Sequence, residues 1–521
     1  MRGAALALLL FFQLGETIEV RVTNVDVVVT DREGKPVRGL TRDDFVVTED
    51  KKPQTLTNFA EYGDNVSVEG AAQVQRRPPR HIVLLLDDAS VDPFVRGQLF
   101  DSISKAVPKL VEPGDEMMVV TWFGSMHIRQ PFTGDLDAVM KAIREDRDRG
   151  GGLPYMVGTH NALDDLNGPM LGRMSGSRQT EQLRTMLRMW ASERLSQQKN
   201  FIAAAKSLVS TLAGTEGRKL LVIATGYMPV EPGAELFEYA ATKYPALMSA
   251  RRVDNDMTAA HEDLAKFANA AGVSIDSIYP NLDLGAEGSE RMMDFSRSRM
   301  TFTEVANTSA ALDNLAKATG GTAFTQVRDF EKVLTTFQQQ LSSYYSLGYR
   351  SPSTTGNHTI AVQLKNHPEL KVVSRSSYTP KSHDDIAKDR AVANLFRDGK
   401  ADFEVKIDRG AAVKQKRDRY IVPLRILFPN KLLFLPEGNE FTGRYTVYIA
   451  VADRDGDLAP VATQEQPIRL SAEQKAQLEG KTVGNMLQLL VRGGEQTVSI
   501  VVRDENGGSV GAGRIKFKPD T

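Results

Sequence analysis

The sequence of 521 residues contains no cysteine. It therefore has no disulfide, no thiolate metal ligand, no cysteine nucleophile and no cysteine lipidation site. The chain also lacks an excess of charge of either sign, because 65 Lys and Arg residues nearly balance 66 Asp and Glu residues. The resulting net charge of −1 favours neither nucleic acid nor an acidic membrane surface as a partner.

Motifs of the common enzyme classes are missing as well. The sequence has no His-Glu-x-x-His, no Gly-x-Ser-x-Gly, no phosphate-binding loop and no dinucleotide-binding fingerprint. Its seven histidines are scattered along the chain. We therefore predict that the protein is not an enzyme. A metal-dependent hydrolase built around Asp87 and Asp88 is the less favoured enzymatic alternative.

Long hydrophobic runs are absent, and the one short run of interest lies near the start. Met1-Arg2-Gly3 is followed by the apolar stretch Ala4–Phe12, which is typical of a secretory signal and too short to span a bilayer. We predict that residues 1–15 are a signal-peptide-like segment and that the protein is exported, periplasmic or secreted. The alternative is a buried apolar segment. We expect no membrane span in the mature chain.

The length indicates several domains, since one domain commonly has about 100–200 residues. Alternating strand and helix patterns predict a doubly wound α/β unit, and the segments beside it alternate as β-strands do. The predicted order is N-terminal strands (16–62), a linker (63–80), the α/β unit (81–344), further strands (345–380), a linker (381–400) and a C-terminal β-sandwich of immunoglobulin or fibronectin type (401–521). The α/β unit is then inserted in, or flanked by, one β-sandwich that the two groups of strands complete.

Within this scheme some segments have a specific prediction. The arginines of Arg76–Arg80 are expected to form a solvated lead-in to the α/β unit. Glycine-rich Arg149–Thr159 and polar Asn167–Gly176 are predicted loops, and residues 179–192 and 201–212 are predicted as separate helices. Asn281–Arg299 is predicted to be a long polar loop.

Oxygen-bearing side chains follow the most hydrophobic predicted strand, Ile82–Leu86. Asp88, Ser90 and Asp92 alternate, so an extended turn would direct three oxygen atoms to one point. Carboxylate and hydroxyl oxygens suit Mg²⁺, and the carboxyl ends of parallel strands are where α/β sheets bind ligands. Alternatively, Asp92 only caps the helix that Pro93 begins, and the other two residues lie in a solvated turn.

Asp88-Ala-Ser90-Val-Asp92 resembles the D-x-S-x-S motif of the metal-ion-dependent adhesion site in von Willebrand factor A (VWA) domains, with Asp in place of the last Ser. Starting the motif at Asp87 would place Ala89 and Val91 at the hydroxyl positions. The resemblance implies a second-loop threonine, carried over to Thr159, and a third loop in which Thr225 replaces the usual Asp. The predicted ligands of a degenerate site, with weak or absent Mg²⁺ binding, are Asp88, Ser90, Asp92, Thr159 and Thr225.

Longer segments extend the resemblance over residues 17–380. They are similar to the VWA-related secreted proteins common in Acidobacteria, and comprise Val27–Val37, Leu40–Phe45, Leu315–Phe324 and Tyr344–Tyr349. This resemblance implies export and a VWA fold, without an established reaction or ligand. We predict a protein-binding module for an unknown protein ligand. The alternative is a metal-free scaffold of the cell envelope or of a secreted assembly.

Overall fold

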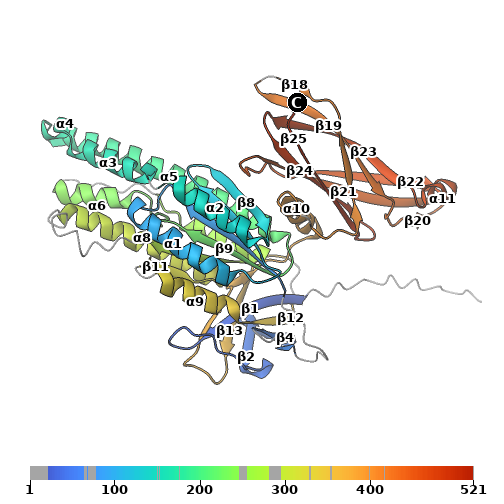
Figure 1. The fold of residues 1–521 in the computed structure, drawn as a ribbon, viewed down its shortest axis with the longest axis horizontal. Coiled ribbons are helices and arrows are strands. Elements are labelled where there is room, and N and C mark those ends of the chain that lie inside the picture. Colours follow the sequence, from blue (N-terminus) through green and yellow to red (C-terminus); the bar gives the residue numbers. More distant parts are fainter. Residues whose placement is uncertain are drawn as a thin grey trace, which may run out of the picture.

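A computed structural model of the chain describes residues 22–519 except 64–66, 69–77, 150, 152, 175, 246–254, 281–294, 328–329, 352–354, 398 and 416. The signal-like segment 1–15 and most of the predicted loop 281–299 lie outside the described residues. Figure 1 shows an α/β unit, a small β unit beside it, and a separate group of C-terminal strands. None of the described helices has the length and apolar content needed to cross a membrane.

The α/β unit is organised around a six-stranded sheet. Its strand order is β11-β10-β9-β6-β7-β8, and all pairs are parallel except β7 with the edge strand β8. The central strand β6 (Arg80–Asp87) is buried throughout and has β7 on one side and β9 on the other. This is the point where the strand order reverses, and it places ligands at the carboxyl ends of the strands. The other bounds are β7 (Glu116–Trp122), β8 (Met126–Thr133), β9 (Arg218–Ala224), β10 (Val273–Pro280) and β11 (Ala323–Val327).

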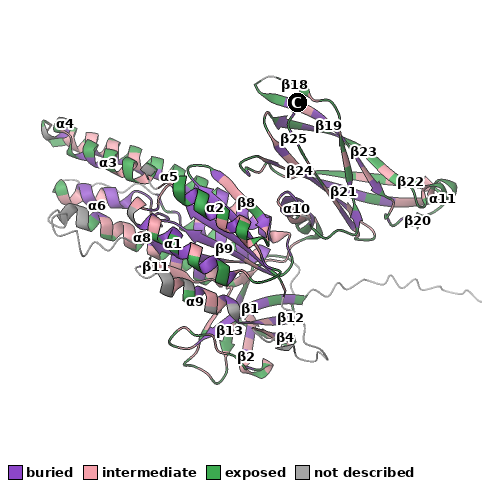
Figure 2. Cartoon of the chain, viewed as in Figure 1, coloured by how far each residue is buried: buried purple, intermediate pink, exposed green. Residues whose placement is uncertain are grey.

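Helices cover both faces of this sheet, which explains why its strands are apolar without alternation. One apolar core joins the sheet to α1 (Pro93–Leu110), α2 (Leu136–Arg149) and α9 (Phe330–Ser342). The core on the other face joins it to α5 (Gly176–Ala213), α7 (Thr258–Ala271) and α8 (Phe295–Thr319). Figure 2 shows the buried residues concentrated between these layers.

A helical extension projects from the α/β unit and has a small core of its own (Figure 1). It contains α3 (Leu153–Asn167), α4 (Pro169–Gly172), α6 (Ala234–Lys243) and the first half of α5. The predictions here are wrong in two places: α3 occupies most of the expected loop 149–159, and α5 is one helix of 38 residues. The polar residues between the two predicted helices interrupt the apolar pattern, but they include no Gly or Pro that would end a helix.

The start of β6 corrects another expectation. Arg80 is not part of a solvated lead-in: it is 2% exposed, and its guanidinium binds the carboxylate of Asp115 through Nε at 2.9 Å and Nη2 at 2.6 Å. A second guanidinium contact, from Nη2 to the carbonyl of Leu110 at 2.7 Å, ties the end of α1 to the same side chain. Arg80 thus belongs to the buried structure of the α/β unit.

The small β unit draws its strands from both sides of the α/β unit in sequence. Its two sheets have the orders β14-β1-β12-β4-β5 and β15-β13-β2-β3, and they share one core that includes Val27, Phe45, Tyr345 and Ile360. The bounds are β1 (Val22–Thr30), a 3₁₀ turn (Arg42–Asp44), β2 (Phe45–Glu49), β3 (Lys52–Gln54), β4 (Leu56–Tyr62), β5 (Ser67–Val68), β12 (Tyr344–Arg350), β13 (His358–Leu364), β14 (Lys371–Ser374) and β15 (Ser377–Tyr378).

The C-terminal part begins with α10 (His383–Ala393), which contacts α5 as well as β21 and β24. Two sheets follow, and residues such as Leu424, Val447 and Ile500 form their common core. The larger sheet contains β16 (Phe403–Glu404), β20 (Leu435–Glu437), β21 (Glu440–Asp453), β22 (Ala462–Ser471), β24 (Gln496–Asp504) and β25 (Val510–Phe517). The smaller contains β17 (Lys406–Arg409), β18 (Val413–Lys414), β19 (Arg419–Pro429) and β23 (Thr482–Arg492), and α11 (Ala472–Leu478) connects β22 to β23.

The shared core of the small β unit predicts a contrast between two valines of β1. Val27 is fully buried, whereas Val22 is 43% exposed. Val27→Ala should destabilise this unit by about 2 kcal/mol, because it removes buried methyl groups and leaves a cavity. Val22→Ala should change stability by less than about 0.5 kcal/mol. Urea unfolding of both variants checks this, and equal effects would contradict the shared core.

Candidate functional site

The candidate site lies where β6 ends and the first loop begins. Successive side chains of an extended segment point in opposite directions, so the adjacent carboxylates of Asp87 and Asp88 diverge. Both side chains are buried, at 3% and 5% exposure. They have different partners, and these partners determine which aspartate belongs to the carboxyl edge of the sheet.

Asp87 is held by the two hydroxyl groups that meet at this edge. Thr225, directly after β9, donates from Oγ1 to Asp87 Oδ2 over 2.7 Å, and Ser90 Oγ donates to the same oxygen. The two hydroxyl oxygens are 3.2 Å apart. The first and third loops approach so closely that a Cβ on Gly226 would lie 2.3 Å from the carbonyl oxygen of Ser90. Glycine is required there because its backbone admits this contact.

The electrostatic state of Asp87 follows from its position. Burial raises its pKa to about 6, and the neighbouring Asp88 adds to the shift. Hydrogen bonds from Ser90, Thr225 and the Ala89 amide act in the opposite direction, because they favour the charged carboxylate. Asp87 is therefore a buried carboxylate whose charged form a nearby cation would stabilise.

The Asp88 side chain contacts a different set of charged residues. Its Oδ1 accepts a hydrogen bond from Arg96 Nε over 2.9 Å, and Arg96 Nη2 lies 3.5 Å from Asp146 Oδ2. Burial raises the pKa of Asp146 to about 7, and the charge of Asp88 contributes to this shift. A Cβ on Gly151 would lie 2.9 Å from Arg96 Nε, so the glycine-rich segment packs on this ion pair.

Two other predicted ligands also lie in different surroundings. Asp92 directly precedes α1, and its carbonyl accepts hydrogen bonds from the amides of Val95 and Arg96, as the helix-start interpretation expects. Thr159 lies within α3, where its hydroxyl donates to the carbonyl of Tyr155 and accepts from Arg194 Nη2 over 2.8 Å. The structure thus brings Ser90 and Thr225 together with Asp87, and places Asp88, Asp92 and Thr159 in other contacts. Metal binding by the five predicted ligands stays a prediction.

A buried cluster behind the site was missed by the sequence analysis. Arg194 of α5 is 5% exposed, and it pairs with Glu235 of α6 and donates to the Tyr155 hydroxyl over 2.7 Å. Its guanidinium lies 4.6 Å from the Tyr155 ring centre and 5.3 Å from that of Tyr227. The Tyr227 hydroxyl donates to Glu235 over 3.0 Å. These contacts fix the third loop against the helical extension.

A cavity of about 140 Å³ opens at this edge of the sheet. Its lining includes Asp87, Ser90, Gln198, Tyr155 and, on its rim, Phe123, which is 49% exposed. Gln198 is 6% exposed and donates to the Tyr227 carbonyl, yet its Oε1 has no hydrogen-bond partner among the described residues. The Asp87 carboxylate, the Ser90 hydroxyl and the Gln198 amide belong to this lining, whereas Thr225 is fully buried, lies outside the lining and contacts Asp87. Carboxylate, hydroxyl and amide oxygens are hard donors, so this set fits Mg²⁺. With one carboxylate in the set, binding should be weak.

The raised pKa of Asp87 predicts a pH dependence of stability. Between its ordinary value near 4 and about 6, the folded protein binds more protons at Asp87 than the unfolded chain does, so Asp87 lowers the unfolding free energy as pH rises. Asp87→Asn keeps an oxygen for both hydroxyls and removes the charge. Relative to wild type it should gain about 3 kcal/mol between pH 4 and pH 7.

Urea unfolding in EDTA at a series of pH values measures this difference. Asp137→Asn, on the exposed surface of α2, is the matched control and should follow the wild-type curve. Parallel pH profiles for Asp87→Asn and wild type would contradict the buried, charged state of Asp87.

Comparisons with known proteins give only distant likenesses. No protein-family model and no curated protein sequence matches the chain. Among solved structures, the chain is similar to a von Willebrand factor type A protein from Catenulispora acidiphila at 11% identity, covering 91% of this chain and 74% of that one, with a TM-score of 0.28. BatB from Bacteroides thetaiotaomicron matches at 12% identity over 50% and 97%, with a TM-score of 0.24. The vWF domain of the pilus tip protein Mfa5 from Porphyromonas gingivalis matches at 14% over 46% and 95%, with a TM-score of 0.21. At such scores these likenesses carry no argument, and the account rests on the chain's own topology and contacts.

Proposed function

We propose that the protein is an exported, non-enzymatic protein-binding module whose binding face is the carboxyl edge of the α/β sheet around Asp87. The observation that carries this proposal is the cavity at that edge, whose lining includes the buried Asp87 carboxylate, the Ser90 hydroxyl, the unpartnered Gln198 oxygen and an exposed phenylalanine. Exposed aromatic side chains beside a polar centre are favoured anchors of protein interfaces. In this proposal the chain is a VWA-type module with a degenerate adhesion site, similar to the secreted VWA-related proteins.

In this proposal Asp87, Ser90 and Thr225 hold Mg²⁺ weakly, together with Gln198 and water. A bound Mg²⁺ would supply a positive charge, and an acidic side chain of the partner would complete the coordination of the ion. The protein's own residues position that charge: the two hydroxyls orient Asp87, and Gly226 allows the loops to meet. Phe123 would contribute apolar contact at the rim.

We further infer that each of the two flanking β units is a β-sandwich, the C-terminal one of immunoglobulin or fibronectin type, and that the α/β unit is inserted in the first. The pairing of β1 with β12, and of β2 with β13, supports the insertion. Such an arrangement gives the α/β unit two fixed ends and leaves its carboxyl edge for a partner.

A metal-free scaffold of the cell envelope or of a secreted assembly is the second candidate. It is favoured by the hydrogen bonds that Asp87 already accepts from Ser90, Thr225 and Ala89, and by the pairing of Asp88 with Arg96. In that case the α/β unit has only a structural role, and the β units make the contacts with partners. A metal-dependent hydrolase is a third, weaker alternative.

Calorimetric titration with Mg²⁺ separates the candidates. Wild type and Asp92→Asn should show saturable binding in about the millimolar range, and Asp87→Asn should show none, because Asp87 supplies the charge. Acetate, as the simplest carboxylate probe, should strengthen Mg²⁺ binding only where Asp87 is intact. No heat with wild type would favour the scaffold, and loss of binding in Asp92→Asn alone would restore the motif register that starts at Asp88. Circular dichroism of each variant controls for folding.

A further inference from the structure

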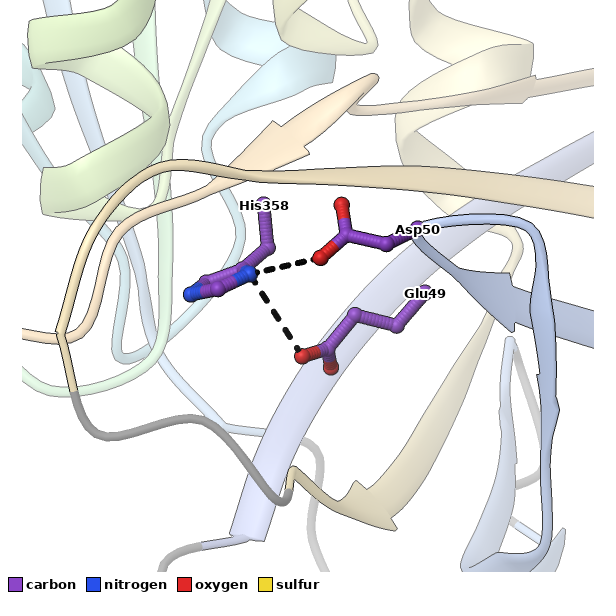
Figure 3. Close-up of side chains that lie close together, drawn as sticks. All are labelled: Glu49, Asp50 and His358. Carbon is purple, nitrogen blue, oxygen red and sulfur yellow. Dashed lines mark hydrogen bonds and ion pairs between the residues drawn. The ribbon is translucent and has the colours of Figure 1, made fainter.

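A second group of charged side chains lies in the small β unit. Glu49 ends β2, Asp50 begins the turn to β3, and His358 begins β13 (Figure 3). One ligand atom from each of the three side chains lies within 4.8 Å of the others. The side chains in Figure 3 point toward one another from two neighbouring strand ends, one before and one after the α/β unit in sequence.

The turn holds Asp50 in place. Asp50 and Lys51 have φ values of 48° and 65°, which are the left-handed conformations of a tight hairpin turn. The Asp50 amide donates to the Thr359 carbonyl, and the Thr359 amide donates to Asp50 Oδ1, both over 2.9 Å. With Oδ1 occupied in this way, Oδ2 is left facing His358 Nδ1 at 2.8 Å.

The tautomer of His358 is set by its other nitrogen. Nε2 lies 2.8 Å from the carbonyl oxygen of Thr355, which can only accept, so Nε2 carries a proton. In a neutral ring Nδ1 then has no proton, and its lone pair faces two carboxylates, which is unfavourable. The arrangement requires a positive charge at Nδ1, and accordingly the hydrogen bond to Asp50, followed by that to Thr355, raises the pKa of His358.

A proton at Nδ1 satisfies Asp50 but not Glu49. Glu49 is 2% exposed, and its Oε1 lies 3.9 Å from Nδ1, which is too far for a hydrogen bond. Oε1 accepts from the Ser351 hydroxyl, while Oε2 has no hydrogen-bond partner among the described residues. Burial raises the pKa of the adjacent Tyr349 hydroxyl, and the neighbouring Glu49 carboxylate raises it further, so a buried negative charge lies beside this hydroxyl.

From this geometry we propose that Glu49, Asp50 and His358 bind a divalent transition-metal ion of the Zn²⁺ class, which joins the β2–β3 turn to β13. One imidazole and two carboxylates are a ligand set that Zn²⁺ accepts, with water in the fourth position. The bond from Nε2 to a backbone carbonyl is the usual support of a metal-binding histidine. Asp50 is half exposed and leaves the ion a path from solvent.

The bound ion would fasten the two chain segments that enclose the α/β unit. His358 and Asp50 are 308 residues apart in sequence, and the ion would stabilise the native pairing of β2 with β13 because it binds only when both are in place. This site does not depend on the proposed function of Asp87, and each can fail without the other.

Zinc titration of the full-length protein, after dialysis against EDTA, tests the site by calorimetry and thermal unfolding. Wild type should bind one Zn²⁺ per chain and melt at a higher temperature with zinc, and binding should weaken as pH falls because protons compete at His358. His358→Gln and Asp50→Asn should each weaken binding at least about tenfold and remove the thermal shift. Asp50→Asn retains the acceptor for Thr359 and serves as the test if His358→Gln folds poorly.

Two matched controls complete the experiment. His367→Gln removes a histidine of the same unit that lies outside the proposed ligand set and pairs with Glu369, and Asp87→Asn removes the other proposed cation site. Both should keep the zinc response of wild type. No zinc binding by wild type, or equal zinc binding by wild type and Asp50→Asn, would overturn the proposal.

Discussion

The ion pair between Asp88 and Arg96 determines the geometry of the carboxyl edge. Asp87 ends β6 and Asp88 follows it, and a strand can turn only one of the two side chains toward the loop after β9. Arg96, one turn into α1, holds Asp88 beside Asp146 in buried surroundings. Breaking such a pair leaves an uncompensated buried charge, which costs about 3–5 kcal/mol, so Asp88 is confined to this role. Asp87 is thereby assigned to the edge, where Ser90 and Thr225 meet it.

The same edge is joined to the helical extension by polar contacts rather than by a continuous apolar core. Thr225 lies two residues before Tyr227, whose hydroxyl reaches Glu235, which in turn pairs with Arg194. Arg194 also binds Tyr155 and Thr159 of α3. Each of these side chains has a hydrogen-bond partner in the cluster, as buried polar groups require, although Glu235 Oε2 has none among the described residues. The result is a carboxyl edge whose loops are fixed by three helices and whose cavity is preformed.

Much of this arrangement could be predicted from the sequence. The apolar run Ile82–Leu86, the helix start at Asp92-Pro93 and the position of Thr225 after a buried strand are local patterns, and local patterns follow from strand burial and capping. The motif register could not be predicted, because spacing alone favours Asp88 and the deciding partner, Arg96, is indistinguishable from a surface arginine in sequence. Thr159 was expected in a loop because Gly150–Gly152 suggested one, whereas α3 begins at Leu153 and contains Thr159.

Long-range partners had no signal in the sequence. Arg194 and Glu235 lie on separate helices, and Asp50 and His358 are separated by the entire α/β unit. Four positions before and after Arg194 lie Trp190 and Gln198, of which only the first is apolar, so the sequence gives no periodic signal that this arginine is buried. Helix packing brings the first pair together and strand pairing the second, so these charged clusters are recognised from the structure and not from motifs.

Anomalous diffraction from crystals of the protein grown with Mn²⁺ in place of Mg²⁺ would test the assignment of Asp87 most directly. The account predicts a peak beside the Asp87 carboxylate, within coordination distance of Ser90 and Thr225. A peak between Asp88 and Asp92, or none anywhere on the α/β unit, would contradict it.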